Sequence, residues 1–144
     1  MKKTLIILPA YNVEKEIYNL LSNMQNYREN VIIVDDGSTD NTFQIIDSLN
    51  YNVIRQEKNA GVASAIKIGI NYANNGYQSA VFMDSDGQHS PKYIDGFLKL
   101  LETYDFVVGN RFHINTTAPD IKLGSNLLVL IIVKKFLGKK YNDI

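Results

Sequence analysis

The sequence has 144 residues, in which 15 lysines and arginines balance 15 aspartates and glutamates, and it contains no cysteine. This length fits one domain over residues 1–144, and the balanced charge gives no basic field that would favour nucleic acid as a partner. The lack of cysteine excludes a disulfide framework, a thiolate nucleophile and a cysteine zinc site, and it suits a reducing compartment.

Short apolar runs alternate with longer amphipathic stretches along the chain. Strands are predicted at residues 5–8, 31–34, 52–55, 80–83 and 105–108. Apolar side chains between them recur at the spacing of one helix face, which predicts helices around residues 17–24, 43–49, 65–73 and 94–101. Ser90 with Pro91 is typical of a helix start, and Asn75 with Gly76 of a helix end. This alternation predicts an α/β fold, with a mostly parallel sheet and helices on both of its faces.

The longest apolar run, residues 127–133, is far below the ~20 residues needed to cross a bilayer. We predict a helix over residues 120–138 that packs in the core. Because lysines flank this run, the alternative is a helix at an anionic membrane surface. If such an apolar face were left uncovered, it would favour self-association into a homo-oligomer or peripheral membrane contact.

Polar clusters follow every predicted strand. They occupy residues 9–12, 35–38, 58–61, 84–89 and 109–111. Because ligands of parallel sheets bind beyond the carboxyl ends of the strands, we expect these clusters to line one site.

The cluster after the fourth strand has the pattern of an open metal site. In extended backbone Asp84, Asp86 and Gln88 would point to one side, and Gly87 allows a turn among them. Mg²⁺ and Mn²⁺ prefer such oxygen ligands, and two acids with one amide are too few for a closed cage. The set suits a cation that also holds a phosphorylated substrate. The alternative is a pair of solvated turn acids.

Other side chains in these clusters suit a nucleotide. Tyr11 could stack on a base or sugar, Asp36 could accept hydrogen bonds from a base N–H or a ribose hydroxyl, and Gly61 opens a helix whose N–H groups could face phosphate. Arg111 could bind two phosphate oxygens, whereas His89 could donate to phosphate, support the metal shell or be structural. A surface tyrosine, a simple helix start and a surface arginine are the alternatives. The chain has no Walker loop and no Gly-x-Gly-x-x-Gly after its first strand, which disfavours a nucleoside triphosphatase or a dehydrogenase.

Taken together, residues 9–12, 32–40, 59–61, 84–89 and 108–111 resemble, in order and spacing, the family 2 glycosyltransferases of GT-A fold. The similarity is greatest to the polyprenyl-phosphate sugar transferases, the branch typified by dolichyl-phosphate mannose synthase. It implies a Rossmann-like nucleotide-diphospho-sugar transferase fold. Many relatives carry a glutamate at the position of Val13, and the position of Val62 is often a lysine or arginine in them. They also continue beyond residue 144, so we expect the nucleotide-binding part to be complete and the acceptor part incomplete.

The resemblance also implies roles for single residues. It implies a sugar nucleotide held by Pro9, Ala10, Tyr11, Asp36, Gly61 and Asp84. It implies Mg²⁺ or Mn²⁺ held by Asp84, Asp86 and Gln88, with Asp86 and Arg111 in catalytic roles. The expected reaction is an inverting transfer of sugar to polyprenyl phosphate, or to a saccharide, for cell-envelope polysaccharide at the cytoplasmic face of the membrane.

Two other functions compete with this interpretation. One is a truncated module that binds a sugar nucleotide without transferring the sugar. The other is a signalling receiver domain, in which Asp35 and Asp36 would form the acidic pair and Asp84 would accept the phosphoryl group. A receiver domain would place that pair after its first strand, however, and here the pair follows the second.

Overall fold

The computed structural model describes residues 4–109 and 132–133. Its sheet has the order β3-β2-β1-β4-β6-β5. The strands are β1 (Thr4–Ala10), β2 (Val31–Asp35), β3 (Asn52–Arg55), β4 (Ser79–Phe82), β5 (Phe106–Val107) and β6 (Ile132–Val133). The first four are parallel, whereas β6 is antiparallel to both of its neighbours. The predicted mostly parallel sheet is therefore confirmed.

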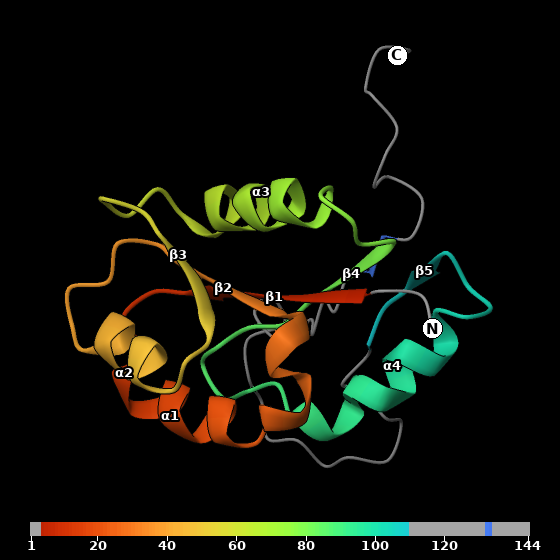
Figure 1. Cartoon of the computed structure of the whole chain (residues 1–144), viewed down its shortest axis with the longest axis horizontal. Coiled ribbons are helices and arrows are strands. Elements are labelled where there is room, and N and C mark those ends of the chain that lie inside the picture. The colour runs from red at the N-terminus through yellow and green to blue at the C-terminus, as the bar shows by residue number, and fades with distance from the viewer. Residues whose placement is uncertain (1–3, 110–131, 134–144) are drawn as a thin grey trace, which may run out of the picture.

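Helices cover both faces of this sheet, as predicted (Figure 1). The α-helices are α1 (Glu14–Ser22), α2 (Thr42–Ser48), α3 (Val62–Ala73) and α4 (Ile94–Leu100). Helix α3 lies on one face, while α1, α2 and α4 lie on the other (Figure 1). The sequence pattern missed two 3₁₀ segments, η1 (Gln25–Asn30) and η2 (Pro91–Tyr93). The latter begins at Pro91, with Ser90 before it, so the predicted start is confirmed, although Ser90 makes no side-chain cap hydrogen bond.

The alternation of side chains along β1 builds two cores. Ile6 and Leu8 belong to the cluster on the side of α1, α2 and α4, whereas Leu5 and Ile7 belong to the cluster under α3. All four side chains are at most 1% exposed. Burying each contributes about 1.5–3 kcal/mol relative to leaving it in water. An apolar run without polar alternation therefore marks a strand that is covered on both faces.

The predicted helix over residues 120–138 is wrong for Ile132–Val133, which form β6. Val81 of β4 pairs with Ile132, and β5 pairs along the other edge of β6. A short run of β-branched residues fits a buried strand as well as a helix, because periodicity alone cannot separate the two. The rest of residues 120–138 lies outside the described part of the chain. Within residues 4–109 and 132–133, no helix combines the length and the apolarity needed to cross a membrane.

The strand order fixes where a ligand would bind. Successive connections move from β1 to β2 and β3 in one direction, and the chain then returns to place β4 on the other side of β1. The edge between β1 and β4 is thus the point where the order reverses, and ligands of open α/β sheets bind at that point. A receiver domain has the strand order 2-1-3-4-5. The observed order therefore contradicts the receiver alternative.

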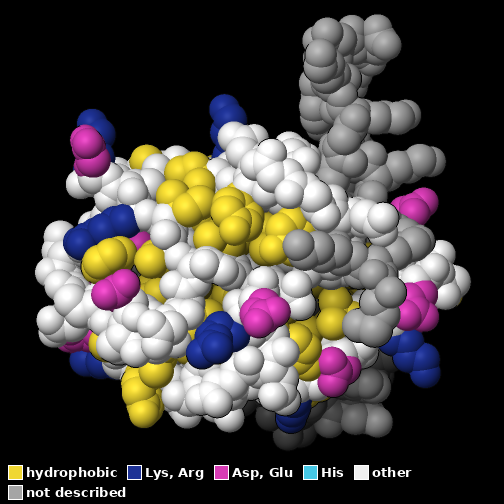
Figure 2. Space-filling view, viewed as in Figure 1, with side chains coloured by type: hydrophobic (Ala, Val, Ile, Leu, Met, Phe, Trp, Pro, Cys, Tyr) yellow, Lys and Arg dark blue, Asp and Glu magenta, His cyan; other side chains and the backbone are white. Residues whose placement is uncertain are grey.

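Charge on the visible face of the molecule is dispersed. Figure 2 shows acidic and basic side chains interspersed on that face, with apolar side chains surfacing over the sheet below α3. No single-sign patch gathers in this view, which agrees with the balanced composition.

Candidate active site at the carboxyl ends of β1 and β4

A cavity of about 290 Å³ opens at the reversal point of the sheet. Its lining includes most of the predicted nucleotide-binding and metal-binding residues, namely Pro9, Ala10, Tyr11, Asp36, Gly61, Asp84 and Asp86. These come from four different strand ends, so the fold brings together residues that lie up to 77 positions apart in the sequence. Asn59 and Ser85, which belong to the predicted clusters, also line it, whereas Val13, Val62 and Ala65 were not predicted to do so.

Asp36 organises one wall of this cavity. Asp36 is buried and only 3% exposed. Its carboxylate accepts hydrogen bonds from the Ala60 N–H (2.9 Å), the Gly61 N–H (2.7 Å) and the Gln56 side-chain amide. A carboxylate offers about four lone-pair sites, which leaves room for one more donor from a ligand. The N–H of Gly61 itself is engaged by Asp36, so that group is not available to phosphate in this structure.

Gly37 permits the loop after β2 to touch the loop after β3. It has φ +71°, and a Cβ atom at this position would lie 2.6 Å from the Lys58 carbonyl carbon and 2.8 Å from the Asn59 nitrogen. No side chain fits there. This contact keeps Asp36 close to the N–H groups of Ala60 and Gly61.

Asp35, the other acid of the pair, has a structural role. It is fully buried, and its Oδ1 accepts the Ser38 N–H at 3.0 Å. Arg55 Nε lies 3.1 Å from Asp35 Oδ2, an ion pair without hydrogen-bond alignment, and Arg55 Nη2 donates to the Ser38 carbonyl. The guanidinium also lies over the Phe43 ring, 4.5 Å from its centre. Asp35 therefore fixes the turn, and Asp36 alone faces the cavity.

Asn12 links the loop after β1 to the loop after β2. It adopts φ +51°, its N–H donates to Ser38 Oγ at 3.0 Å, and its Oδ1 accepts the Thr39 N–H at 2.8 Å. Positive φ is uncommon for a residue with a side chain, but asparagine tolerates it better than most. These bonds hold the neighbouring Tyr11, which is 44% exposed, at the mouth of the cavity.

A second set of contacts joins the starts of α1 and α2. Glu14 Oε2 accepts bonds from Asn41 N and Nδ2, and Asp40 accepts the N–H groups of Glu14 and Thr42. Burial acts to raise the pKa of Asp40, but the combined hydrogen bonds from Thr42 and Glu14 lower it below the ordinary value of 3.8. Glu14, one place after the position where relatives carry a glutamate, therefore bonds to Asn41 and is not among the residues that line the cavity.

The metal-site candidates lie on a loop anchored to β1. Ser85 Oγ donates to the Pro9 carbonyl at 2.6 Å, and the buried Ser85 thereby ties this loop to the end of β1. Asp86 Oδ1 accepts the Gln88 N–H at 2.9 Å, while Gly87 turns the chain with φ +77°. The side chain of Asp84 is 60% exposed.

This loop fits an open cation site. Asp84 and Asp86 line the same cavity, whereas Gln88 is not among its lining residues. In the described part of the chain, no three His, Cys, Asp or Glu side chains gather in a group that could hold a metal ion by themselves. Two accessible carboxylates on a cavity suit a hard cation that completes its shell with water and substrate phosphates.

His89 contacts both the backbone and the carboxylate of Asp84. Its residue is 5% exposed, its Nδ1 accepts the Asp84 N–H at 2.9 Å, and its Nε2 lies 3.5 Å from Asp84 Oδ2. A backbone N–H can only donate, so Nδ1 must be unprotonated and the proton of a neutral imidazole sits on Nε2.

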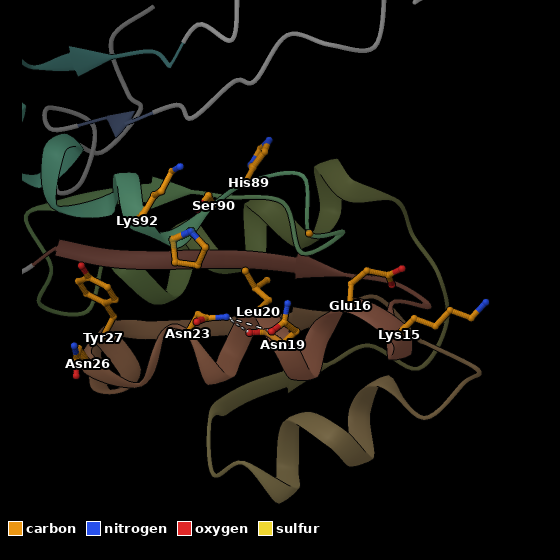
Figure 3. Close-up of a pocket in the computed structure, with 12 residues that line it drawn as sticks. Lys15, Glu16, Asn19, Leu20, Asn23, Asn26, Tyr27, His89, Ser90 and Lys92 are labelled. Atoms are coloured by element: carbon orange, nitrogen blue, oxygen red, sulfur yellow. Dashed lines mark hydrogen bonds between the residues drawn. The ribbon is translucent and has the colours of Figure 1, made fainter.

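A larger cavity of about 590 Å³ lies between α1 and residues 87–92. Lys15 and Lys92 lie at opposite ends of it, so they do not converge on one ligand (Figure 3). The Asn23 amide on its floor donates to Asn19 (Figure 3). Except for Gly87 and His89, none of its residues belongs to the predicted clusters. We therefore take the smaller cavity as the candidate site. Arg111, the remaining catalytic candidate, lies outside the described residues.

The parallel strands, the antiparallel β6 and the carboxylate-lined cavity at the reversal point define the GT-A class of α/β fold. This fold is shared with glucosyl-3-phosphoglycerate synthase from Mycobacterium tuberculosis in complex with UDP, with a TM-score of 0.65 and 22% identity over 78% of this chain and 46% of that chain. The same enzyme with Mn²⁺ and UDP-glucose gives a TM-score of 0.61 and 23% identity over 71% of this chain and 40% of that one.

Within that class, the chain belongs to glycosyl transferase family 2, whose family model matches residues 5–143. An uncharacterised protein of Methanocaldococcus jannaschii is 36% identical over 146 aligned positions, which cover 90% of this chain and 64% of that protein. The UDP-N-acetylglucosamine–dolichyl-phosphate N-acetylglucosaminyltransferase of Methanococcus voltae is 38% identical, over 74% of this chain and 51% of the relative. The chain thus spans between about half and two thirds of the length of these two relatives.

Proposed function

We propose that this protein is a metal-dependent, inverting glycosyltransferase that moves a sugar from a nucleotide-diphosphate sugar to polyprenyl phosphate. The observation that carries the proposal is the cavity that Tyr11 and Asp36 line together with Asp84 and Asp86. Family membership supports sugar transfer, and the name of the Methanococcus voltae relative supports a lipid-phosphate acceptor.

The donor would bind across the reversal point of the sheet. Pro9, Ala10 and Tyr11 would hold the nucleoside, and Asp36 would accept one hydrogen bond from it with its remaining lone pair. Asp84 and Asp86 would hold Mg²⁺ or Mn²⁺, which would supply positive charge to stabilise the departing diphosphate. Gln88 and Arg111 belong to the same proposal as a further metal ligand and a phosphate-binding group.

Transfer then depends mainly on alignment. The cavity would hold the anomeric carbon in reach of an acceptor oxygen, and a single displacement inverts its configuration. A lipid phosphate is already ionised, so it needs no general base, whereas a saccharide hydroxyl would need a carboxylate to take its proton. The name of the Methanococcus voltae relative favours the phosphate acceptor. Such an acceptor would place the protein at the cytoplasmic face of a membrane.

Metal-dependent nucleotide binding tests the proposal. UDP and GDP are titrated calorimetrically with and without Mn²⁺, using the parent, Asp86→Ala and the control Asp47→Ala, whose exposed side chain lies on α2 away from the cavity. We expect Mn²⁺ to raise the affinity for one of these nucleotides by on the order of tenfold or more, and Asp86→Ala to remove that gain. Asp47→Ala should behave as the parent does. If Mn²⁺ does not change the affinity of the parent for either nucleotide, the proposal is contradicted.

A transfer assay separates an enzyme from a binding module. The parent is incubated with a radiolabelled nucleotide sugar and either polyprenyl phosphate or soluble saccharides, and the lipid phase is counted. Label that enters the lipid phase supports the proposed reaction. Tight metal-dependent nucleotide binding without any transfer would instead support the non-catalytic alternative.

A further inference from the structure

His89 is held against Asp84 at two points. Its Nδ1 accepts the main-chain N–H of Asp84 at 2.9 Å, and its Nε2 lies 3.5 Å from Oδ2 of the same residue. The imidazole is 5% exposed, whereas the Asp84 side chain is 60% exposed. A buried ring therefore lies against a solvent-exposed carboxylate that lines the cavity.

The hydrogen bond at Nδ1 determines which group Nε2 presents to the Asp84 carboxylate. Because Nδ1 accepts a hydrogen bond from the backbone, the neutral ring carries its proton on Nε2, directed at the Asp84 carboxylate. The distance of 3.5 Å exceeds the 2.7–3.2 Å range of a well-formed hydrogen bond. The contact is thus a weak restraint here, and it can shorten when a cation fixes the carboxylate.

The backbone that carries Asp84 is restrained on its other side as well. Ser85 is 4% exposed, and its Oγ donates to the Pro9 carbonyl at 2.6 Å. The main chain at Asp84 is therefore fixed by His89 and Ser85 before any ligand arrives. Rotation of the Asp84 side chain is the freedom that remains, and Nε2 of His89 is placed to limit it.

We propose that His89 is a positioning residue that orients the Asp84 carboxylate for a divalent cation through its Nε2–H. In this arrangement Oδ2 of Asp84 faces His89 and Oδ1 remains for the cation. Hydrogen bonds to ligating groups commonly set metal affinity in this way. This inference rests on the proposed function, because it takes Asp84 as a metal ligand, and it adds a role for a residue that does not line the donor cavity.

Two substitutions separate the contacts of the ring. His89→Asn keeps an acceptor near the Nδ1 position but removes the donor that faces the carboxylate. His89→Gln extends an amide to the Nε2 position but gives up the Nδ1 acceptor. Binding of Mn²⁺ alone, and of Mn²⁺ with UDP, is measured from the electron paramagnetic resonance signal of the free ion. We expect His89→Asn to weaken Mn²⁺ binding by about tenfold and His89→Gln to stay within about threefold of the parent.

A purely structural role predicts a different result. Both variants would then lose Mn²⁺ affinity to the same extent, in step with their melting temperatures, and that outcome overturns the inference. Unchanged Mn²⁺ binding in His89→Asn also overturns it. If the parent binds Mn²⁺ alone but no nucleotide, the proposed function fails while the inference can still hold. If the parent binds Mn²⁺ with UDP and the variants do not differ, only the inference fails.

A measurement on the parent alone avoids dependence on folded variants. Nitrogen NMR of the imidazole reports which ring nitrogen carries the proton. We expect the Nε2-protonated form in the metal-free protein, with a shift of the Nε2 resonance on addition of Mg²⁺. A ring protonated on Nδ1 would contradict the hydrogen bond from the Asp84 N–H. An Nε2 resonance that does not shift on addition of Mg²⁺ would contradict the proposed role of His89 in orienting the Asp84 carboxylate.

Discussion

Individual carboxylates of this protein have separate tasks although they lie close in the sequence. Asp35 is buried in an ion pair with Arg55, whereas Asp36 gathers the N–H groups of Ala60 and Gly61 at the cavity. Asp40 ties together the starts of two helices. Each task follows from which donors reach the carboxylate, because a buried acceptor without a partner would be costly.

Asp40 should make stability depend on pH. Its pKa is lowered in the folded protein, so its contribution is fully present above the ordinary value of 3.8 and is lost as the pH falls through the folded value. We expect Asp40→Ala to lower the free energy of unfolding by about 1 kcal/mol at neutral pH, the usual magnitude for loss of a helix cap. Urea unfolding at neutral pH and at about pH 3 should show this difference shrinking in acid.

The control for Asp40 is Asp47→Ala, which removes an exposed acid of α2. It should change the free energy of unfolding by less than about 0.5 kcal/mol. A difference between the parent and Asp40→Ala that is equally large in acid would show that the carboxylate charge is not what stabilises the two helix starts.

At the scale of elements, a comparison of two glycines in the described helices shows how closely α3 approaches the sheet. Gly69 of α3 is buried, and a Cβ atom there would overlap Ile7 Cγ2 of β1 and lie 3.1 Å from Ile7 Cδ1. Gly96 of α4 has no atom within 4 Å of the same position. The first glycine is therefore required by packing, whereas the second is not.

Gly69→Ala and Gly96→Ala should consequently change stability in opposite directions. Alanine in a helix interior gains roughly 0.5–1 kcal/mol over glycine, but overpacking a core costs typically ~1–3 kcal/mol. We expect Gly69→Ala to lower the melting temperature and Gly96→Ala to raise it slightly, as measured by circular dichroism. If Gly69→Ala were as stable as the parent, α3 would have room to move away from Ile7.

The elements that the sequence could predict are those with a repeated pattern. The helices α1, α2, α3 and α4 and the parallel strands each repeat an apolar spacing over several residues, which is the signal that periodicity detects. The segment η1 buries no residue and so lacks an apolar spacing, η2 has only three residues, and β6 is a β-branched pair that suits either a strand or a helix.

For the candidate site too, the sequence could predict some features and not others. That Tyr11, Asp36 and Asp84 meet follows from parallel strands whose carboxyl ends share one edge. The hydrogen-bond partners within the site could not be predicted in this way. Gln56 reaches Asp36, and Ser85 reaches Pro9, because of the shapes of the loops. The spacing of residues along the sequence does not tell how far apart two loops lie in the folded protein.

For the molecule as a whole, the two cavities make separate predictions about where a ligand acts. The smaller one joins the ends of β1, β2 and β4 and the start of α3, whereas the larger one is confined to α1, η1 and residues 87–92. A ligand in the first would connect loops from both halves of the sheet. A ligand in the second would rest on one face only.

Amide hydrogen exchange with UDP and Mn²⁺ distinguishes them. Binding lowers the population of locally open states in the segments that the ligand holds together. We expect slower exchange in residues 9–13, 59–62 and 84–86, which line the smaller cavity, and little change in residues 15–27 of α1 and η1. Asp86→Ala should abolish the protection in all three segments together, because the cation links the loop after β4 to the nucleotide. Protection concentrated in residues 15–27 would instead place the nucleotide in the larger cavity and remove the structural basis for assigning Asp36 and Asp84 to the donor.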